Sequence, residues 1–131
     1  MEKQELNTHL KFNKKFGQLV EIGEGTAKVI LEATEEMAVD EEGLIHGGFT
    51  FGAADFCAMA TVNHPYVVLV KSQCEFMAPV KVGDVVEFVS ETIMKEKRKH
   101  EIKVTGTLNE IKVFEGFFSC VILEKHVLKR L

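Results

Sequence analysis

Residues 46–65 read HGGFTFGAADFCAMATVNHP, and this stretch decides the fold. Within residues 49–62, Asp55 is the only charged residue. A segment that is apolar on every side is typical of a buried helix rather than a surface helix. We therefore expect a buried helix over about residues 48–64, ended by Pro65 because the residue before a proline disfavours the helical conformation.

The carboxylate of Asp55 is the unusual feature of this predicted helix. A buried carboxylate must find hydrogen bonds or an ionic partner, or else take up a proton. Such a residue is seldom kept for stability alone, which makes Asp55 a candidate for chemistry. The alternative is a buried carboxylate tied to a neighbouring strand, although isolated buried aspartates without partners are uncommon.

The composition indicates one globular domain spanning residues 1–131. Apolar residues make up 46% of the chain and charged residues 27%, which is typical of a soluble globular protein. The net charge of −4 argues against general nucleic-acid binding, which requires a basic surface. No apolar run reaches the roughly 18–20 residues of a membrane-spanning helix, so we expect no membrane insertion.

The cysteines indicate a reducing compartment. Cys57, Cys74 and Cys120 are odd in number and lie in apolar segments, so we expect reduced, buried thiols in a cytoplasmic protein. The first five residues are polar and mixed in charge, unlike a targeting peptide. We expect no metal site, because the sequence contains no Cys-x-x-Cys pair and no His/Cys cluster with zinc spacing.

Most of the remaining chain has the pattern of strands. A rough apolar stripe predicts a short helix over residues 4–16, and a helix-like tail is expected after residue 124. The predicted strands cover residues 18–24, 26–34, 67–76, 85–95, 100–108 and 113–124. Short polar turns join the last three strands, which predicts an antiparallel meander. A helix this apolar requires a sheet that wraps it, or a second subunit that covers its open side.

Two motifs resemble one known family. His46-Gly47-Gly48 is followed by Asp55 nine residues after the histidine and then by Asn63, and the later run at 76–84 reads FMAPVKVGD. Together they resemble the hotdog-fold acyl-CoA thioesterases of the phenylacetic-acid-degradation (PaaI-like) type. The resemblance implies an α+β hotdog fold, in which a curved antiparallel sheet of five or six strands wraps a long central helix. It also implies a homodimer, assembled further as a dimer of dimers.

The same resemblance implies the substrate and the site. The substrate would be a thioester on coenzyme A or on acyl carrier protein, with no cofactor beyond the coenzyme A of the substrate. The site would use the Gly48 N–H and the Asp55 carboxylate, with His46 lining it. Asp55 would act as general base on water or attack the thioester directly to give an anhydride. For His46, holding the loop is the alternative that we favour.

Gly47 and Gly48 suit this chemistry on physical grounds. Glycine lets the backbone approach a ligand closely, and the N–H groups of a first helical turn have no partner within the helix. Together with the helix dipole they favour an oxygen that gains negative charge. The alternative is a tight turn from loop to helix. Phe49 and Asn63 are further candidates for substrate contact, although a core position for Phe49 and a helix cap for Asn63 are the simpler interpretations.

Helix geometry predicts that the site is shared between two subunits. Gly48 and Asp55 are seven residues apart, which is about two turns and roughly 10 Å along a helix axis. Reacting groups must lie within roughly 3–3.5 Å, so one chain's pair cannot reach the same carbon atom. Two antiparallel helices would place Gly48 of one chain beside Asp55 of the other.

Two positions depart from the family pattern. Many members carry an asparagine six residues before the histidine, where this chain has Asp40, and a serine or threonine near the start of the following strand, where it has Val68, Leu69 and Val70. The first change removes a contact to the substrate carbonyl, and the second removes a hydroxyl that can hold the attacking water. We therefore keep a non-catalytic acyl-CoA-binding module on the same fold as the alternative function.

A dehydratase or hydratase on this fold is less favoured, because no His/Asp or His/Glu pair is evident. The basic run at residues 95–100 is expected to be a solvated hairpin tip, with attraction of the coenzyme A phosphates as the alternative.

Overall fold

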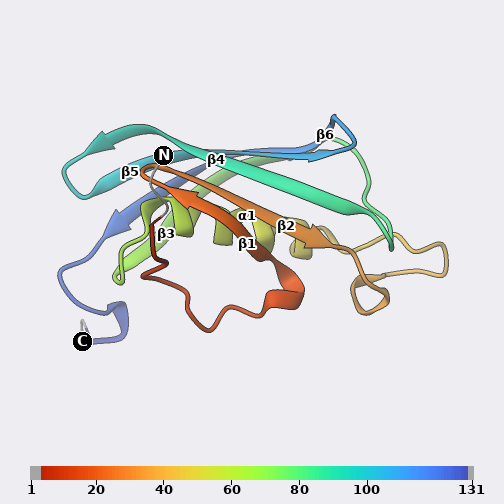
Figure 1. Ribbon diagram of the computed structural model, residues 1–131, viewed down its shortest axis with the longest axis horizontal. Helices are drawn as coiled ribbons and strands as arrows, with labels where there is room; N and C mark the ends of the chain where they lie inside the picture. The colour runs from red at the N-terminus through yellow and green to blue at the C-terminus, as the bar shows by residue number, and fades with distance from the viewer. Residues whose placement is uncertain (1–3, 130–131) are drawn as a thin grey trace.

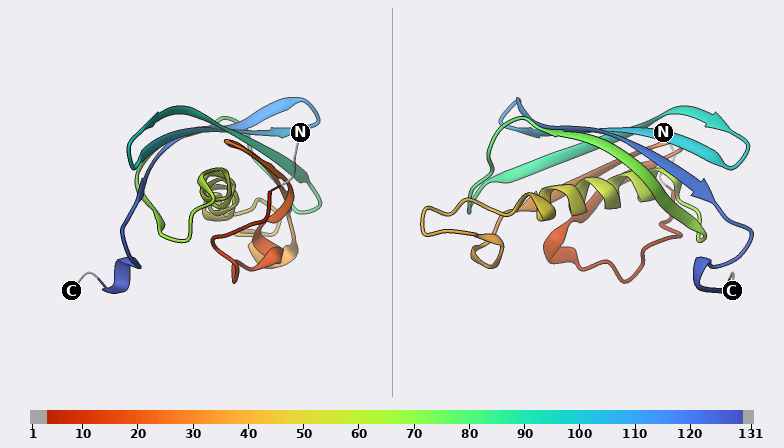
Figure 2. Two further views of the ribbon diagram at one scale, coloured as in Figure 1. Left: turned by 60° about the vertical axis from the view of Figure 1, so that its left-hand side comes forward. Right: turned by 180° about the vertical axis from the view of Figure 1, so that it is seen from behind.

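One α-helix, α1 (Gly47–Val62), lies in the hollow of a curved sheet in residues 4–129, the part of the chain that the computed structural model describes (Figures 1 and 2). The sheet contains β1 (Gln18–Gly23), β2 (Thr26–Glu32), β3 (Val67–Phe76), β4 (Val85–Glu96), β5 (Lys99–Leu108) and β6 (Ile111–Ile122). Three short 3-10 turns complete the elements: η1 (Lys14–Phe16), η2 (Glu35–Met37) and η3 (Val127–Lys129).

The sheet has the strand order β1-β2-β4-β5-β6-β3, and every neighbouring pair is antiparallel. The meander of the last three strands and the wrapped helix are therefore confirmed, and with them the hotdog fold expected from the sequence. β1 and β3 form the two edges. β3 is the longer edge, with 10 residues against 6 for β1, and its only neighbour within residues 4–129 is β6.

The helix is apolar on nearly every side because most of its surface is covered. Ala53, Ala54 and Ala58 are fully buried, and small side chains there let the helix approach the sheet closely. The polar groups that face the sheet satisfy one another. Ser90 of β4 and Thr61 of α1 each donate a hydroxyl hydrogen bond to the Cys57 carbonyl oxygen, at 3.1 and 2.9 Å. Such pairing removes the free-energy cost of burying unpaired polar groups.

The helix predicted over residues 4–16 is wrong. Residues 4–13 contain no helix, and only the 3-10 turn η1 follows them. This segment instead runs along the side of α1 that the sheet leaves open (Figure 2). Phe12 stacks on Phe56 of the helix with ring centroids 4.4 Å apart, and Phe16 packs against Phe49 at 5.3 Å.

Tertiary contacts explain why no helix forms there. The Gln4 N–H donates to the Ile22 carbonyl oxygen at 3.2 Å, and the Asn7 N–H donates to Asn63 Oδ1 at 2.6 Å. His9 has a φ of 52°, which a right-handed helix excludes. Phe12 and Phe16, two of the apolar residues that suggested a helix, pack against α1 instead, so packing overrides the local preference.

Candidate functional site

The start of α1 is built around His46 and two glycines. His46 is the N-cap residue, and its Nδ1 accepts a hydrogen bond of 2.7 Å from the Gly48 N–H. An acceptor at Nδ1 requires a neutral ring with its proton on Nε2. A Cβ atom at position 48 would lie 2.7 Å from His46 Nδ1, so glycine is required for this contact. His46 therefore caps the start of α1 in the structure, and its part in a substrate site stays a prediction.

Replacing His46 with alanine should lower the free energy of unfolding by about 1 kcal/mol, because the cap on the Gly48 N–H is lost. Urea denaturation followed by circular dichroism measures the change. His46→Asn is the matched control, since asparagine is a strong N-cap residue and should recover most of the loss. Equal stability of the wild-type protein and both variants would show that the ring does not cap the helix.

Asp40, at the first departure from the family pattern, organises the loop before the helix. Its Oδ1 accepts hydrogen bonds from the N–H groups of Glu42 and Leu44, at 3.0 and 3.1 Å. The side chain is exposed, and these bonds fold it back on its own loop. The position therefore supports the turn that leads into His46.

Asp55 lies in the middle of α1 with an unusual environment. Within residues 4–129, its Oδ1 is buried and has no hydrogen-bond partner. Burial raises the pKa of Asp55 to about 6. Burial and, secondly, the charge of Asp55 raise the pKa of the Cys120 thiol on β6 to about 12. A carboxylate with a free oxygen and a pKa this close to neutrality has the properties of a general base.

Gly48, Gly52 and Asp55 share one face of α1. Residues four and seven positions apart on a helix lie on the same side, and the seven-residue step spans roughly 10 Å along the axis. A Cβ added at Gly52 would meet nothing within 4 Å, so the space between Gly48 and Asp55 is open. The structure keeps the two groups too far apart to act on one atom from the same chain.

A hydroxyl that the sequence analysis missed lies opposite this part of the helix. Ser72 of β3 pairs with Phe118 of β6, and cross-strand partners point to the same face of a sheet. Phe118 is fully buried and packs against Phe51 of α1, so Ser72 also belongs to the face that holds the helix. Ser72 lies beyond positions 68–70, where the hydroxyl was expected, because a bulge between Leu69 and Lys71 shifts the inward-facing positions along β3.

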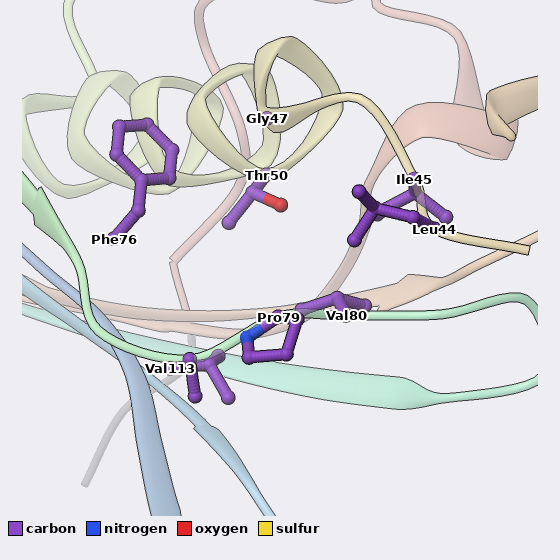
Figure 3. A pocket seen from close by; sticks show the side chains of 9 residues that line it. Leu44, Ile45, Gly47, Thr50, Phe76, Pro79, Val80 and Val113 are labelled. Atoms are coloured by element: carbon purple, nitrogen blue, oxygen red, sulfur yellow. The ribbon is translucent and has the colours of Figure 1, made fainter. Parts of the chain in front are cut away.

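A small cavity adjoins the start of the helix (Figure 3). It has a volume of about 170 Å³. Thr50 and Gly47 of α1 line one side, Pro79, Val80 and Val113 lie across from them, and Phe76 lies beside the helix. The cavity adjoins Gly47, the residue before Gly48, and its walls are almost entirely apolar.

The remaining candidates lie at different places along the helix. Phe49 is half-buried and packs against Phe16, in agreement with a core position. Asn63 is the C-cap residue in the left-handed conformation, and its Nδ2 donates to the Glu5 carbonyl oxygen at 2.8 Å. It lies at the end of α1 opposite Gly48, so in its own chain it is remote from the helix start.

The basic run at residues 95–100 forms the tip of the β4–β5 hairpin. Arg98 is exposed and forms an ion pair with Glu124 at 3.4 Å. Arg98 and His64 line one surface hollow, which places the tip beyond the C-terminal end of α1. The 16-residue length of α1 separates this end from Gly48 by roughly 20 Å.

Changing Lys97, Arg98 and Lys99 together to serine should leave the Michaelis constant for an acyl-CoA within about threefold, because exposed charges act weakly beyond a screening length of roughly 8 Å. Steady-state kinetics at low and physiological salt measure the effect. A rise of about tenfold, or roughly 1.4 kcal/mol, that fades with added salt would show that the tip reaches the nucleotide.

No group of three or more His, Cys, Asp or Glu side chains within residues 4–129 is arranged to hold a metal ion. In the same residues, no helix has the length and apolar character needed to cross a bilayer.

Comparison with protein families gives one match over more than half of the chain. The family model described as "Thioesterase superfamily" matches residues 42–114, which include the helix and the cavity. The uncharacterized protein PH1136 from Pyrococcus horikoshii has a solved structure that is 46% identical, with a TM-score of 0.96. That alignment covers 98% of this chain and 99% of PH1136.

Two more distant structures share the fold. The PaaI protein from the E. coli phenylacetic acid degradation operon aligns with a TM-score of 0.78 at 17% identity, over 86% of this chain and 83% of its own. A hypothetical thioesterase from Streptococcus pneumoniae, solved with coenzyme A, aligns with a TM-score of 0.74 at 18% identity, over 84% and 88%. Both agree with the resemblance found in the sequence.

Curated relatives are longer proteins. The methylthioribose-1-phosphate isomerase of Aquifex aeolicus is 42% identical over 120 residues, covering 91% of this chain but 26% of the isomerase. The transcription factor FapR of Caldanaerobacter subterraneus is 28% identical over 115 residues, covering 87% of this chain and 58% of FapR. The chain thus spans about a quarter of the first relative and under two thirds of the second.

Proposed function

Because the chain belongs to the thioesterase superfamily, we propose that it hydrolyses an acyl thioester, carried by coenzyme A or acyl carrier protein, to a free acid and a thiol. The observation that carries the proposal is the Asp55 carboxylate, with a buried Oδ1 that has no partner within residues 4–129 and a pKa raised by burial to about 6. The fold shared with the coenzyme A-bound S. pneumoniae protein supports the choice of substrate.

In the proposed reaction, Asp55 removes a proton from a water molecule while the oxygen of that water attacks the thioester carbonyl carbon. The Gly48 N–H donates to the carbonyl oxygen, which gains negative charge. Collapse of the tetrahedral intermediate expels the thiolate, which takes up the proton from Asp55. Direct attack by Asp55, giving an anhydride that water then opens, uses the same groups. The Ser72 hydroxyl lies on the sheet face toward the helix and is our candidate for holding the water.

The bond between His46 and Gly48 bears directly on this reaction. The Gly48 N–H, which is the proposed oxyanion donor, already donates a hydrogen bond of 2.7 Å to His46 Nδ1. The substrate oxygen must therefore displace the ring or share the N–H with it. His46 is exposed and can turn aside without losing core packing. Its ring therefore keeps the helix start ordered until substrate arrives.

We further propose that the active unit is a homodimer, with dimers pairing again into a tetramer. Gly48 and Asp55 of one chain are two helical turns apart, so the site needs Gly48 from one chain and Asp55 from the other. The outer edge of β3, which pairs with no strand among residues 4–129, offers a place for a second sheet to continue, and Val70 on that strand is 60% exposed. The free thiols Cys57, Cys74 and Cys120 support our placement in the cytoplasm.

The pH dependence of turnover follows from the raised pKa of Asp55. A general base works only when ionised, so kcat/KM should rise about tenfold per pH unit below pH 6 and level off above it. Thiol release measured from pH 4 to pH 9 gives the profile. A plateau that continues down to pH 4 would exclude Asp55 as a base with this pKa.

The second candidate is a non-catalytic acyl-CoA-binding module. Two observations favour it: the Gly48 N–H is occupied by His46, and several relatives are transcription factors. Against it stands the buried charge of Asp55, which stabilises neither the fold nor an apolar ligand. Binding of an acyl-CoA without thiol release would favour the module over the enzyme.

A further inference from the structure

The cavity beside the helix start has a rigid, buried floor. Ile45, Thr50, Val80 and Val113 form this floor, and each is at most 5% exposed. Backbone hydrogen bonds hold its parts together. The Ile45 N–H donates to the Val80 carbonyl oxygen at 3.0 Å, and the Met77 N–H donates to the Val113 carbonyl oxygen at 2.8 Å. The floor therefore cannot recede without breaking these bonds.

The opposite side of the cavity opens at the helix start. Leu44, Gly47, Phe76 and Pro79 are exposed and surround the opening. The Phe76 ring lies directly over Gly47, where an added Cβ would be 3.4 Å from its Cε2 atom, and it packs edge-on against Phe114 at 5.3 Å. Gly47 directly precedes Gly48. The acyl chain of a substrate whose carbonyl oxygen is bound by the Gly48 N–H can therefore enter the cavity at this opening.

The chemistry of the lining selects an uncharged, apolar group. None of the nine lining residues carries a charge, and Thr50 supplies the one side-chain hydroxyl, which Figure 3 shows within the cavity. Burying a carboxylate there would cost several kcal/mol without a partner. A dicarboxylic acyl group therefore does not suit the cavity, whereas an alkyl chain or an aromatic ring does.

We propose that this cavity receives the acyl group of the substrate and restricts it to a short chain, an inference that rests on the proposed thioesterase function. A cavity of about 170 Å³ holds about five or six carbon atoms beyond the carbonyl group, since an apolar cavity of about 150 Å³ can hold the six carbons of benzene. Hexanoyl-CoA and benzoyl-CoA match this size. Longer acyl chains do not fit, because backbone hydrogen bonds hold the residues of the cavity floor in place.

Two substitutions change the depth of the cavity in opposite directions. Val113→Ala removes two methyl groups from the floor and should move the preferred chain length upward, to about eight carbons. Ala78→Leu adds three carbon atoms to the lining and should move it downward, to about four. Val104→Ala is the matched control, because Val104 is fully buried in the core but does not line the cavity.

The experiment is a kcat/KM profile over straight-chain acyl-CoAs from acetyl to dodecanoyl. Wild type and Val104→Ala should peak near hexanoyl-CoA and fall at least about tenfold by decanoyl-CoA, in keeping with the selectivity of apolar pockets. Each profile is compared within one variant, so a loss of folded protein cancels. A wild-type optimum at decanoyl or longer, or one optimum for both cavity variants, would overturn the inference.

Failure of the inference is distinguishable from failure of the proposed function. If no chain length is hydrolysed, the thioesterase proposal fails, and the cavity is then tested by calorimetry with S-alkyl-CoA thioethers. Affinity should increase with chain length up to an S-hexyl chain and should not increase further beyond it. Ala78→Leu should shift this limit to shorter chains. An affinity independent of chain length, or one still increasing at S-decyl, would contradict the cavity assignment.

Discussion

Replacing Asp55 with asparagine should reduce thioester turnover by roughly 100-fold or more, because asparagine keeps the shape of the side chain but cannot accept the proton. Initial rates of thiol release from an acyl-CoA measure the effect. Asp84→Asn is the matched control: Asp84 Oδ2 accepts from the Lys81 N–H in a surface turn, and asparagine can keep that bond. Unchanged turnover in a folded Asp55→Asn protein would refute the catalytic assignment.

The same substitution should stabilise the fold. Burial raises the folded-state pKa of Asp55 to about 6, so the native protein loses stability as pH rises from about 4 to 6, where the unfolded chain has already released its proton. Asparagine removes this penalty and should raise the free energy of unfolding by roughly 1–3 kcal/mol at pH 7, with little change at pH 3. Denaturation at the two pH values tests the difference, and equal effects at both would contradict it.

Mixing two inactive variants should restore activity if the site is shared. Gly48→Pro removes the N–H proposed as oxyanion donor, and proline is tolerated in a first helical turn. A dimer of one Gly48→Pro chain and one Asp55→Asn chain has one intact site and one doubly impaired site. Random exchange should therefore recover about a quarter of the wild-type activity, since half of the two-fold dimers are mixed.

Gly48→Ala is the control for crowding at the helix start. A Cβ atom at this position would lie 2.7 Å from His46 Nδ1, so both alanine and proline would push the His46 ring away. Alanine, unlike proline, keeps the backbone N–H. Gly48→Ala should therefore retain more activity than Gly48→Pro. Absence of recovery in the mixtures, with both parents folded and in the oligomeric state of the wild type by size-exclusion chromatography, would contradict the cross-subunit site.

The buried helix and the antiparallel meander could be predicted because their signals are local, and the hotdog fold was expected from the resemblance of two motifs to a known family. An apolar helix with one carboxylate and a meander of alternating strands leave few arrangements, and the structure has α1 at Gly47–Val62 inside six antiparallel strands. The prediction of a helix in the N-terminal segment was wrong, because the conformation of this segment depends on residues that are distant in the sequence. Phe12 packs against Phe56, and the Asn7 N–H bonds to Asn63, both of which lie far away in the sequence.

The candidate site was predictable in part for the same reason. The spacing of Gly48 and Asp55 is a property of one helix, so their separation follows from the sequence. Ser72 was missed because a bulge in β3 changes which residues face inward, and a bulge leaves no clear trace in alternation. The bond from Gly48 to His46 Nδ1 was also invisible, because it depends on the rotamer of one exposed ring.

The most direct test of the central claim compares hydrolysis with binding in the wild-type protein. Hexanoyl-CoA at a concentration above that of the protein should yield free thiol and hexanoic acid in equal amounts over many turnovers. Asp55→Asn should bind the same ligand with similar affinity and release almost no thiol. Tight binding of hexanoyl-CoA by both proteins, with no thiol released by either, would contradict the account and indicate an acyl-CoA-binding module.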